Sequence, residues 1–352
     1  MQSLPKGLRK ILVRSTNWIG DAVMTTPAVR TIRQNFPEAE ITLLALPWVA
    51  DVFRASPRVD RILTYEREGR HAGVRGKLGL AAELRREHFA AAILLQNAFE
   101  AAFITLLAGI PVRAGFTTDG RGLLLTHGVR RRAETKKRHQ VHYYQEMLQG
   151  LGCVPGTDDL ELVVPPEDKQ WAADFLKEAA QAGRKIIGFN PGAAYGPAKR
   201  WPAEKFAVLA GLLHRFPDIV LLVFGTNADR QAAAKIKKEC GDSSRVMDLT
   251  GRTTLAQAMG LISRCHAFVT NDSGLMHVAA ALATPTVAIF GSTNPVTTGP
   301  FSNKTSIVRS ELDCSPCLET HCRKKHFQCM ENIGVDDVLH AVQHHLALQV
   351  SS

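Results

Sequence analysis

The sequence predicts an α/β protein built from two doubly wound halves, and two observations support this. Short apolar segments alternate with segments of helical periodicity along most of the 352 residues. The paired prolines of "DDLELVVPPEDKQ" interrupt the alternation near residue 165, and a second series follows. Alternation of this kind is typical of parallel sheets covered by helices on both faces. We therefore expect a first domain over 1–165, a second over 166–334 and a C-terminal helix over 335–352.

In the first half, apolar segments predict five strands, and the segments between them predict helices. The strands are expected at 10–14, 40–46, 60–65, 89–97 and 112–116. The helices are expected at 22–36, 48–56, 98–109 and 139–152, with a further long helix that ends near Glu87. A glycine-rich, basic loop separates the last strand from the last helix.

The second half repeats the pattern. Strands are expected at 185–190, 219–225, 266–271 and 285–291, and helices at 170–183, 202–216, 228–240, 254–265 and from Leu275 onward. Pro202 suits the first turn of its helix because a first-turn residue needs no amide donor. Parallel sheets bind ligands at the carboxyl ends of their strands, so two halves facing each other predict a cleft lined by strand-end loops.

Charge and hydropathy restrict the class of protein. The net charge is +10, and residues 1–165 contribute +7 of it, from 23 basic and 16 acidic residues. The densest basic run, "RRRAETKKRH", begins at Arg130, and it is either a solvated loop or a surface for an anionic partner. No zinc-finger or other nucleic-acid pattern accompanies it, so we expect no nucleic-acid partner. No apolar run reaches the ~20 residues that span a bilayer, and the N-terminus lacks a signal-peptide pattern, so a cytoplasmic protein is expected.

Four of the seven cysteines cluster in "CSPCLETHCRKKHFQC" as Cys314, Cys317, Cys322 and Cys329. The first pair has the CxxC spacing of a metal site, whereas the later spacings match no common zinc finger. The cluster is therefore either a structural zinc site or a set of free thiols. It lies outside the motifs described below, so we expect no catalytic role for it.

The stretch "TNDSGLMHVAAAL" joins an apolar strand to a small-residue helix through a polar elbow, Asn271 to Gly274. Leu275, Val278, Ala279 and Leu282 share one face of that helix at i, i+3, i+4 and i+7. A helix N-terminus preceded by small polar residues binds anions such as phosphate. The same residues are also good helix caps, and the stretch alone does not distinguish the two interpretations.

Taken in order, the motifs resemble those of the ADP-heptose:lipopolysaccharide heptosyltransferases, family nine of the glycosyltransferases. The resemblance runs from "ILVRSTNWIGDAVMTTPAVRTIR" through "GFNPGAAYGPAKRWP" and "LLVFGT" to "VTNDSGLMHVAAALATPTVAIFG". It implies the GT-B fold of two facing Rossmann-like domains with a cleft between them. It also implies inverting transfer of L-glycero-D-manno-heptose from ADP-heptose to the lipopolysaccharide inner core, with no catalytic metal. The acceptor is lipid-anchored, so peripheral binding to the anionic cytoplasmic face of the inner membrane is expected.

Two residues are predicted to perform the chemistry. Without a metal, the charge that grows on departing ADP needs a fixed cation, and Lys199 in "GPAKRW" is the candidate. The family's catalytic aspartate falls on Asp21, which is predicted to take the proton of the acceptor hydroxyl. The competing interpretation of Asp21 is a helix N-cap at the start of the 22–36 helix.

Further strand-end residues complete the predicted site. The expected donor-binding residues are Asn190, Gly192, Lys199, Thr226, Asp229, Thr253, Thr254, Leu255, Asp272, Ser273, Gly274, Leu275 and His277. The expected acceptor-binding residues are Thr16, Asn17, Trp18 and Gly20. Asp272 would repel phosphate, so we expect it to cap the helix or bind a sugar hydroxyl, and Asp229 either binds ribose or caps a helix. A two-Rossmann epimerase and a non-catalytic nucleotide-sugar binding protein remain alternative functions.

Overall fold

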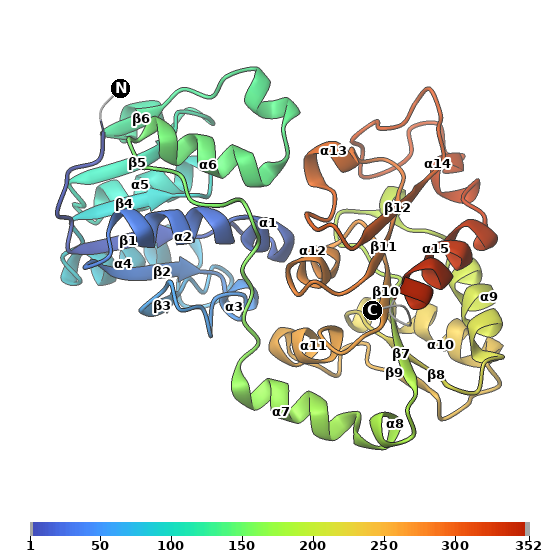
Figure 1. The fold of residues 1–352 in the computed structure, drawn as a ribbon. Coiled ribbons are helices and arrows are strands. Elements are labelled where there is room, and N and C mark those ends of the chain that lie inside the picture. The colour runs from blue at the N-terminus through green and yellow to red at the C-terminus, as the bar shows by residue number, and fades with distance from the viewer. Residues whose placement is uncertain (1–2, 349–352) are drawn as a thin grey trace. The chain divides into compact units, whose positions relative to one another are not determined.

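The computed structural model describes residues 3–348, and the chain folds into two compact units that divide between Val163 and Val164 (Figure 1). Residues 349–352 of the expected C-terminal helix lie outside the described part. Each unit contains one six-stranded sheet, and the neighbouring strands of the described residues pair in parallel. The predicted fold class is therefore confirmed, whereas the cleft between the halves stays a prediction. Within residues 3–348, no helix combines the length and the hydropathy needed to cross a lipid bilayer.

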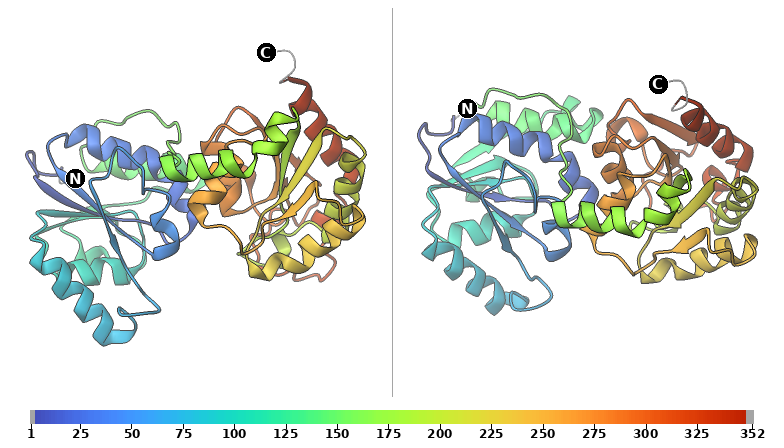
Figure 2. Two further views of the ribbon diagram at one scale, coloured as in Figure 1. Left: turned by 90° about the horizontal axis from the view of Figure 1, so that it is seen from below. Right: turned by 60° about the horizontal axis from the view of Figure 1, so that its bottom comes forward.

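The sheet of the N-terminal unit has the strand order β3-β2-β1-β4-β5-β6. Its strands are β1 (Lys10–Arg14), β2 (Glu40–Ala45), β3 (Arg61–Thr64), β4 (Ala91–Leu94), β5 (Val112–Phe116) and β6 (His127–Val129). Its helices are α1 (Ile19–Met24), α2 (Thr26–Asn35), α3 (Pro47–Ala50), α4 (Gly73–Arg86), α5 (Phe99–Leu107), η1 (Gly122–Leu124), η2 (Glu134–Lys137) and α6 (Gln140–Gly150). Helix α2 packs against α6, and α4 packs against α5 on the other face of the sheet (Figures 1 and 2).

The sheet of the C-terminal unit has the order β12-β11-β10-β7-β8-β9. Its strands are β7 (Lys185–Asn190), β8 (Ile219–Val223), β9 (Val246–Asp248), β10 (Ala267–Asn271), β11 (Thr286–Phe290) and β12 (Thr305–Arg309). Its helices are α7 (Pro166–Phe175), α8 (Lys177–Gln181), η3 (Pro197–Lys199), α9 (Ala203–His214), η4 (Asn227–Asp229), α10 (Arg230–Glu239), α11 (Leu255–Ile262), α12 (Gly274–Ala281), α13 (Pro295–Thr298), α14 (Gln328–Glu331) and α15 (Val335–Leu348).

Both sheets have the same topology, because numbering each unit's strands from one gives the order 3-2-1-4-5-6 twice. In this doubly wound order the chain reverses direction across the sheet between strands 1 and 4, and ligands bind at the carboxyl ends of these strands. The two switch points are β1/β4 in the N-terminal unit and β7/β10 in the C-terminal unit. The fold therefore predicts that ligands bind at the segments after β1, β7 and β10.

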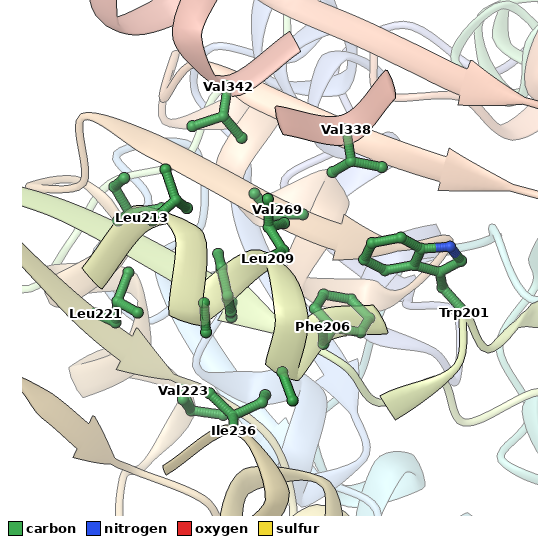
Figure 3. Close-up of a cluster of buried hydrophobic side chains, with 14 of the residues drawn as sticks. Trp201, Phe206, Leu209, Leu213, Leu221, Val223, Ile236, Val269, Val338 and Val342 are labelled. Carbon is green, nitrogen blue, oxygen red and sulfur yellow. The ribbon is translucent and has the colours of Figure 1, made fainter. Parts of the chain in front are cut away.

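The core of the C-terminal unit fixes one of these segments. Trp201, Phe206 and Leu209 pack between the sheet and α15, together with Val338 and Val342 (Figure 3). The Trp201 indole is 1 % exposed and donates a hydrogen bond to the Ile333 carbonyl at 3.1 Å. The loop that follows β7 is thereby anchored at its far end by a side chain of the core.

The first helix differs from its prediction. The expected helix 22–36 begins at Ile19 and is divided at Thr25, where α1 ends and α2 begins. Pro27 has no amide proton and cannot donate to the carbonyl of Val23. The Thr26 hydroxyl donates to that carbonyl instead, at 2.8 Å. The result is a short helix α1 between β1 and α2.

Other differences concern short elements. The helix expected at 48–56 is only α3, and the helix expected at 170–183 begins at Pro166 and is interrupted at Leu176. Strands β6, β9 and β12 were not predicted, because they are short edge strands with few buried residues. Pairing with a neighbouring strand determines such segments more than their own sequence does.

Candidate functional site

The segment after β1 is held in place by a buried arginine. Arg14 is 4 % exposed and donates to the Asn17 side-chain oxygen at 2.8 Å, while its guanidinium lies 5.4 Å from the ring centroid of Tyr65. Burial lowers the pKa of Arg14 to about 10, so it remains charged at neutral pH. The exposed Trp48 indole donates to the Asn17 carbonyl at 3.0 Å. Asn17 is thus fixed by both its side chain and its backbone, and Trp18 beside it is 60 % exposed.

Asp21 does not cap the helix, and the N-cap interpretation was wrong. The N-cap of α1 is Trp18, and Asp21 is the third helical residue, half-buried in the first turn. There it lies near Tyr144 of α6, whose pKa is raised well above its usual range by burial and by the charge of Asp21. Gly20 is buried in the same turn. Asp21 therefore adds a carboxylate beside the predicted acceptor residues.

Four buried hydroxyls at strand ends lack a hydrogen-bond partner within the described residues. They belong to Ser15 and Thr16 after β1, to Thr118 after β5 and to Ser292 after β11. Buried polar atoms are normally bonded, and one that is left unpaired costs about 1–3 kcal/mol. All four lie at carboxyl ends of strands, where a ligand or water would supply the missing partner.

In the C-terminal unit, Asn190 and Asn271 connect the two switch-point strands. The Asn190 amide donates to the Ser273 hydroxyl at 2.8 Å and to the Thr270 hydroxyl at 3.0 Å. Asn271 donates to the Pro191 carbonyl at 2.7 Å and accepts from the Trp201 amide at 3.0 Å. Both side chains are 4 % exposed or less. The loop from β7 and the elbow from β10 therefore form one rigid unit.

Lys199, from the loop after β7, and Asp272, from the elbow after β10, form an ion pair. The Lys199 ammonium lies 2.6 Å from the Asp272 carboxylate, and their side chains are 13 % and 5 % exposed. The Thr293 hydroxyl, from the loop after β11, donates to the same carboxylate oxygen at 2.7 Å. An ammonium group has three N–H donors, and the Asp272 carboxylate accepts only one of them, which leaves two for a ligand. The pair thus presents a positioned cation at a strand end.

Ser273, rather than Asp272, is the N-cap of α12, so the capping role expected for Asp272 was wrong. The Ser273 hydroxyl accepts from the Met276 amide at 3.4 Å, and the helix begins at Gly274. The apolar face expected for this helix was also incomplete. Met276 and His277 are buried, whereas Leu275 is only half-buried. The helix N-terminus adjoins the Lys199–Asp272 pair through the Asp272–Ser273 bond of the chain.

Capping accounts for several other predicted donor residues. Thr226 and Asp229 form a capping box, in which the Asp229 carboxylate accepts from the Thr226 amide at 2.8 Å. A Cβ at Gly192 would lie 2.6 Å from the Asp229 carboxylate, so glycine is needed for this close approach. Thr254 caps α11 in a second capping box, between half-buried Thr253 and Leu255. Contacts of these residues with ribose and adenine stay predictions.

The cysteine-containing segment contacts the Lys199 loop although it lies outside the sequence motifs, and its lack of a catalytic role stays a prediction. The Ala198 amide donates to the Thr320 carbonyl at 3.2 Å, and the Tyr195 hydroxyl donates to the Leu318 carbonyl at 3.3 Å. The Leu318 amide in turn donates to the Ser292 carbonyl at 2.7 Å. The Tyr195 ring centroid is 4.6 Å from the Lys199 ammonium. The segment therefore holds the face of the loop that carries Lys199.

The four cysteines of this segment form no disulfide bond. Burial raises the pKa of the Cys329 thiol, and the charges of Cys317, Cys314 and Cys322 add to the rise. Within the described residues, no group of three or more His, Cys, Asp and Glu side chains is arranged to hold a metal ion. The zinc site stays a prediction.

The sequence reasoning missed four functional candidates: Arg14, Tyr195, Thr293 and Arg121. Arg121 is fully buried and donates to the Phe116 carbonyl at 2.8 Å and to the Asn97 side chain at 2.9 Å, which ties the ends of β4 and β5 together. Their positions in the sequence could have identified them, because each of the four lies in or near the carboxyl end of a strand.

Comparison with known proteins identifies relatives over most of the chain. The sequence model of glycosyltransferase family 9 (heptosyltransferase) matches residues 78–328. The lipopolysaccharide heptosyltransferase 2 of Escherichia coli strain K12 is 34 % identical over 85 % of this chain and 88 % of the relative. The lipooligosaccharide heptosyltransferase 2 of Haemophilus ducreyi is 33 % identical with the same coverage. The structure of E. coli ADP-heptose lps heptosyltransferase II matches 97 % of this chain and 100 % of that chain, with a TM-score of 0.80 and 30 % identity.

Proposed function

Because the chain belongs to glycosyltransferase family 9, the heptosyltransferases, we propose that it transfers L-glycero-D-manno-heptose from ADP-heptose to the lipopolysaccharide inner core. Its relatives are named as heptosyltransferase 2 or II, which supports the assignment that this enzyme adds the second heptose, to the first heptose of the core. The acceptor hydroxyl oxygen attacks the anomeric carbon as the bond from that carbon to the diphosphate oxygen breaks. Attack opposite the leaving group inverts the anomeric configuration.

The Lys199–Asp272 pair at the β7/β10 switch point is the observation that supports this function most directly. Negative charge develops on the ADP diphosphate as the bond breaks, and it needs donors that are already in place. We assign this role to Lys199, with the N-terminus of α12 adding its dipole and its Gly274 and Leu275 amides. Asn190 holds the elbow against the Lys199 loop, so the two groups keep a fixed separation. In this proposal the charge on ADP is met without a catalytic metal.

The acceptor side is assigned to the segment after β1. Asp21 takes the proton of the attacking hydroxyl, and Thr16, Asn17, Trp18 and Gly20 line the acceptor. The unpartnered hydroxyl of Thr16 supports a polar ligand, and the exposed Trp18 indole suits the apolar face of a sugar ring. Arg14 fixes Asn17 and is a positioning residue in this scheme.

One assay distinguishes this function from its alternatives. The protein is mixed with ADP-heptose and a core oligosaccharide that ends in the first heptose, and ADP and elongated acceptor are measured. Equal amounts of ADP and elongated product are expected. An epimerised donor without ADP release would indicate an epimerase, and donor binding without turnover would indicate a binding protein.

Tyr195→Ala is expected to lower the rate of transfer about 2- to 5-fold, since a cation–π contact at an exposed site contributes about 0.5–1 kcal/mol. Tyr195→Phe keeps the ring under Lys199 and loses only the hydrogen bond to Leu318, so a smaller decrease is expected. Tyr195 is 48 % exposed, and neither variant should change the melting temperature much. Equal rates for the two variants would show that the ring does not assist Lys199.

A structural zinc ion in the Cys314–Cys329 segment is proposed as the alternative to four free thiols. Elemental analysis of protein purified without added metal tests it, and one zinc per chain is expected if the site exists. Because the segment bonds the Lys199 loop, removal of zinc by a chelator should then slow transfer and lower the melting temperature together. Metal-free protein with full activity and normal melting would establish the free thiols.

We also propose that the enzyme works at the cytoplasmic face of the inner membrane. A lipid-containing acceptor requires access to a membrane, and the basic residues after β6 suit anionic headgroups. They are Arg130, Arg131, Arg132, Lys136, Lys137 and Arg138. Each basic residue near an anionic surface contributes about 1 kcal/mol. Lys137 and Arg138 pair with Glu134 and Glu146, so part of this charge is already neutralised.

A further inference from the structure

Large apolar side chains are exposed on one side of the N-terminal unit. They are Val74 and Leu78 of α4, Phe99, Phe103 and Leu106 of α5, and Leu123 of η1, with exposures from 38 % to 99 %. We call these six residues the α4–α5 surface. Isolated exposed apolar residues are ordinary, but a contiguous group of them marks an interaction site.

The spacing of these residues places them on the outer sides of two neighbouring helices. In α5, the exposed residues follow each other at i, i+4 and i+7, whereas Ala101, Ala102 and Ile104 are buried. The rings of Phe99 and Phe103 stack with centroids 6.0 Å apart.

Two contacts align α4 with α5. The Lys77 ammonium pairs with the Glu100 carboxylate at one end, and the Arg85 guanidinium donates to the Leu107 carbonyl at 2.5 Å at the other. Helix η1 packs against α5 as well. The six side chains therefore belong to elements that lie next to one another.

The surface begins at the edge of the sheet that carries the acceptor segment. Helices α4, α5 and η1 follow the carboxyl ends of β3, β4 and β5, and Asp21 follows the carboxyl end of β1. Tyr65, next to β3, donates to Glu100 of α5 at 2.8 Å, and its ring lies against Arg14, which holds Asn17. Direct contacts thus connect the surface to the acceptor segment.

The charges around this surface are positive. Arg75, Arg85 and Arg86 of α4 are exposed. Most nearby carboxylates are in ion pairs: Glu66 and Glu83 with Arg70, Glu87 with Lys10 and Arg61, and Glu100 with Lys77. Glu68 and Asp119, in the loops before α4 and η1, are exposed. A second copy of the chain placed symmetrically on this surface would bring arginines against arginines. An anionic lipid headgroup would instead complement them.

We propose that the α4–α5 surface inserts into an anionic lipid bilayer and presents the acceptor segment to the membrane. The inference rests on the proposed function, in which the acceptor is embedded in a membrane. Half-exposed phenylalanine and leucine residues enter the boundary between headgroups and acyl chains, while arginines on the same helices bind the headgroups. The basic residues after β6 add long-range attraction, but the apolar side chains hold the protein at the surface.

The test compares a triple variant, Leu78→Ser with Phe99→Ser and Phe103→Ser, with a matched control, Val208→Ser with Phe216→Ser and Val296→Ser. The control residues are exposed to a similar degree but belong to the C-terminal unit. Binding is measured by co-sedimentation with vesicles of phosphatidylethanolamine and phosphatidylglycerol, and with phosphatidylcholine vesicles. Transfer is measured both with acceptor embedded in the anionic vesicles and with soluble, deacylated acceptor.

The triple variant should bind anionic vesicles at least about 10-fold more weakly than the wild type and the control. Its transfer to embedded acceptor should fall by a similar factor, and its transfer to soluble acceptor should be unchanged. Neutralising the six basic residues after β6 to glutamine should reduce binding mainly at low salt. Phosphatidylcholine vesicles should bind all variants weakly.

Vesicle binding by the triple variant equal to that of the wild type would overturn the proposal. Equal loss of transfer to soluble and embedded acceptor would also overturn it, because the surface would then serve the acceptor or the fold. A wild-type dimer that dissociates in the triple variant would identify a second copy as the occupant. Wild-type protein that binds vesicles but transfers nothing to soluble acceptor would refute the proposed function. The proposal that the α4–α5 surface binds membranes would still stand.

Discussion

Asp21→Asn is expected to give a folded protein that binds ADP-heptose but transfers heptose at least ~100-fold more slowly, since loss of a general base typically costs about 10²–10⁴ in rate. A neutral amide cannot accept the proton of the acceptor hydroxyl. Asparagine has nearly the same shape as aspartate, so packing of the first turn of α1 should be kept.

The position of Asp21 in α1 limits the effect on stability. Asp21 is inside the first turn, where a carboxylate gains about 0.3–1 kcal/mol from the positive end of the helix. The Asn variant loses that gain and the charge near Tyr144, but it leaves the backbone bond from the Thr25 amide to the Asp21 carbonyl intact. A small decrease in melting temperature and a large decrease in rate are therefore expected together.

Asp119→Asn is the matched control. Asp119 lies in the exposed loop after β5, at the same edge of the same sheet, and its φ of 55° is one that asparagine adopts readily. Melting temperature, donor affinity and initial rate should be measured for both variants on single preparations. Transfer by Asp21→Asn at close to the wild-type rate would remove Asp21 from the mechanism.

The sequence was sufficient to predict the doubly wound halves, because buried parallel strands are continuous apolar segments that need no partner to be recognised. It did not predict β6, β9 and β12, which are edge strands of three to five residues with few buried side chains. The N-cap interpretation of Asp21 failed for a related reason. Helix α1 begins at Ile19 without any side-chain cap, so no capping residue marked its start.

The sequence correctly located the loops that follow the strands, but it did not predict the contacts within these loops. Lys199 and Asp272 were both selected as site residues, yet their pairing joins positions far apart in the chain and depends on the order of β7 and β10. The contact of the cysteine-containing segment with the Lys199 loop has the same origin. Thr320 lies beside Ala198 only because the segment after β12 returns across the carboxyl end of the sheet.

The pairing changes how Lys199 should be tested. A single Lys199→Ala change leaves the Asp272 carboxylate buried without its cation, and breaking a buried pair in this way typically costs about 3–5 kcal/mol. Such a variant would lose activity and stability together. Lys199→Ala alone therefore cannot separate an effect on catalysis from an effect on folding.

Lys199→Met in an Asp272→Asn background separates the two effects. The asparagine oxygen can still accept the hydrogen bond from Thr293, and methionine fills the space of the lysine side chain without a charge. Replacing both partners of a buried pair is often neutral for stability. The double variant should therefore melt within a few degrees of the wild type, whereas Asp272→Asn should melt lower, because it leaves the Lys199 ammonium without its carboxylate. Lys235→Met with Glu204→Gln, an exposed ion pair of the same unit, is the control.

The rate of the double variant relative to Asp272→Asn then isolates the role of the ammonium group. If Lys199 stabilises the departing ADP, the double variant should transfer heptose about 10²–10³-fold more slowly than Asp272→Asn, since this is the typical cost of removing one preorganised donor. If Lys199 only neutralises Asp272, its removal has no further effect once the carboxylate is gone, and the two rates will be equal. Donor affinity measured beside the rates adds a second distinction. A group that acts on developing charge changes the rate constant of transfer more than the binding of ADP-heptose, because the ground-state diphosphate carries less charge at the bridging oxygen than the leaving group does.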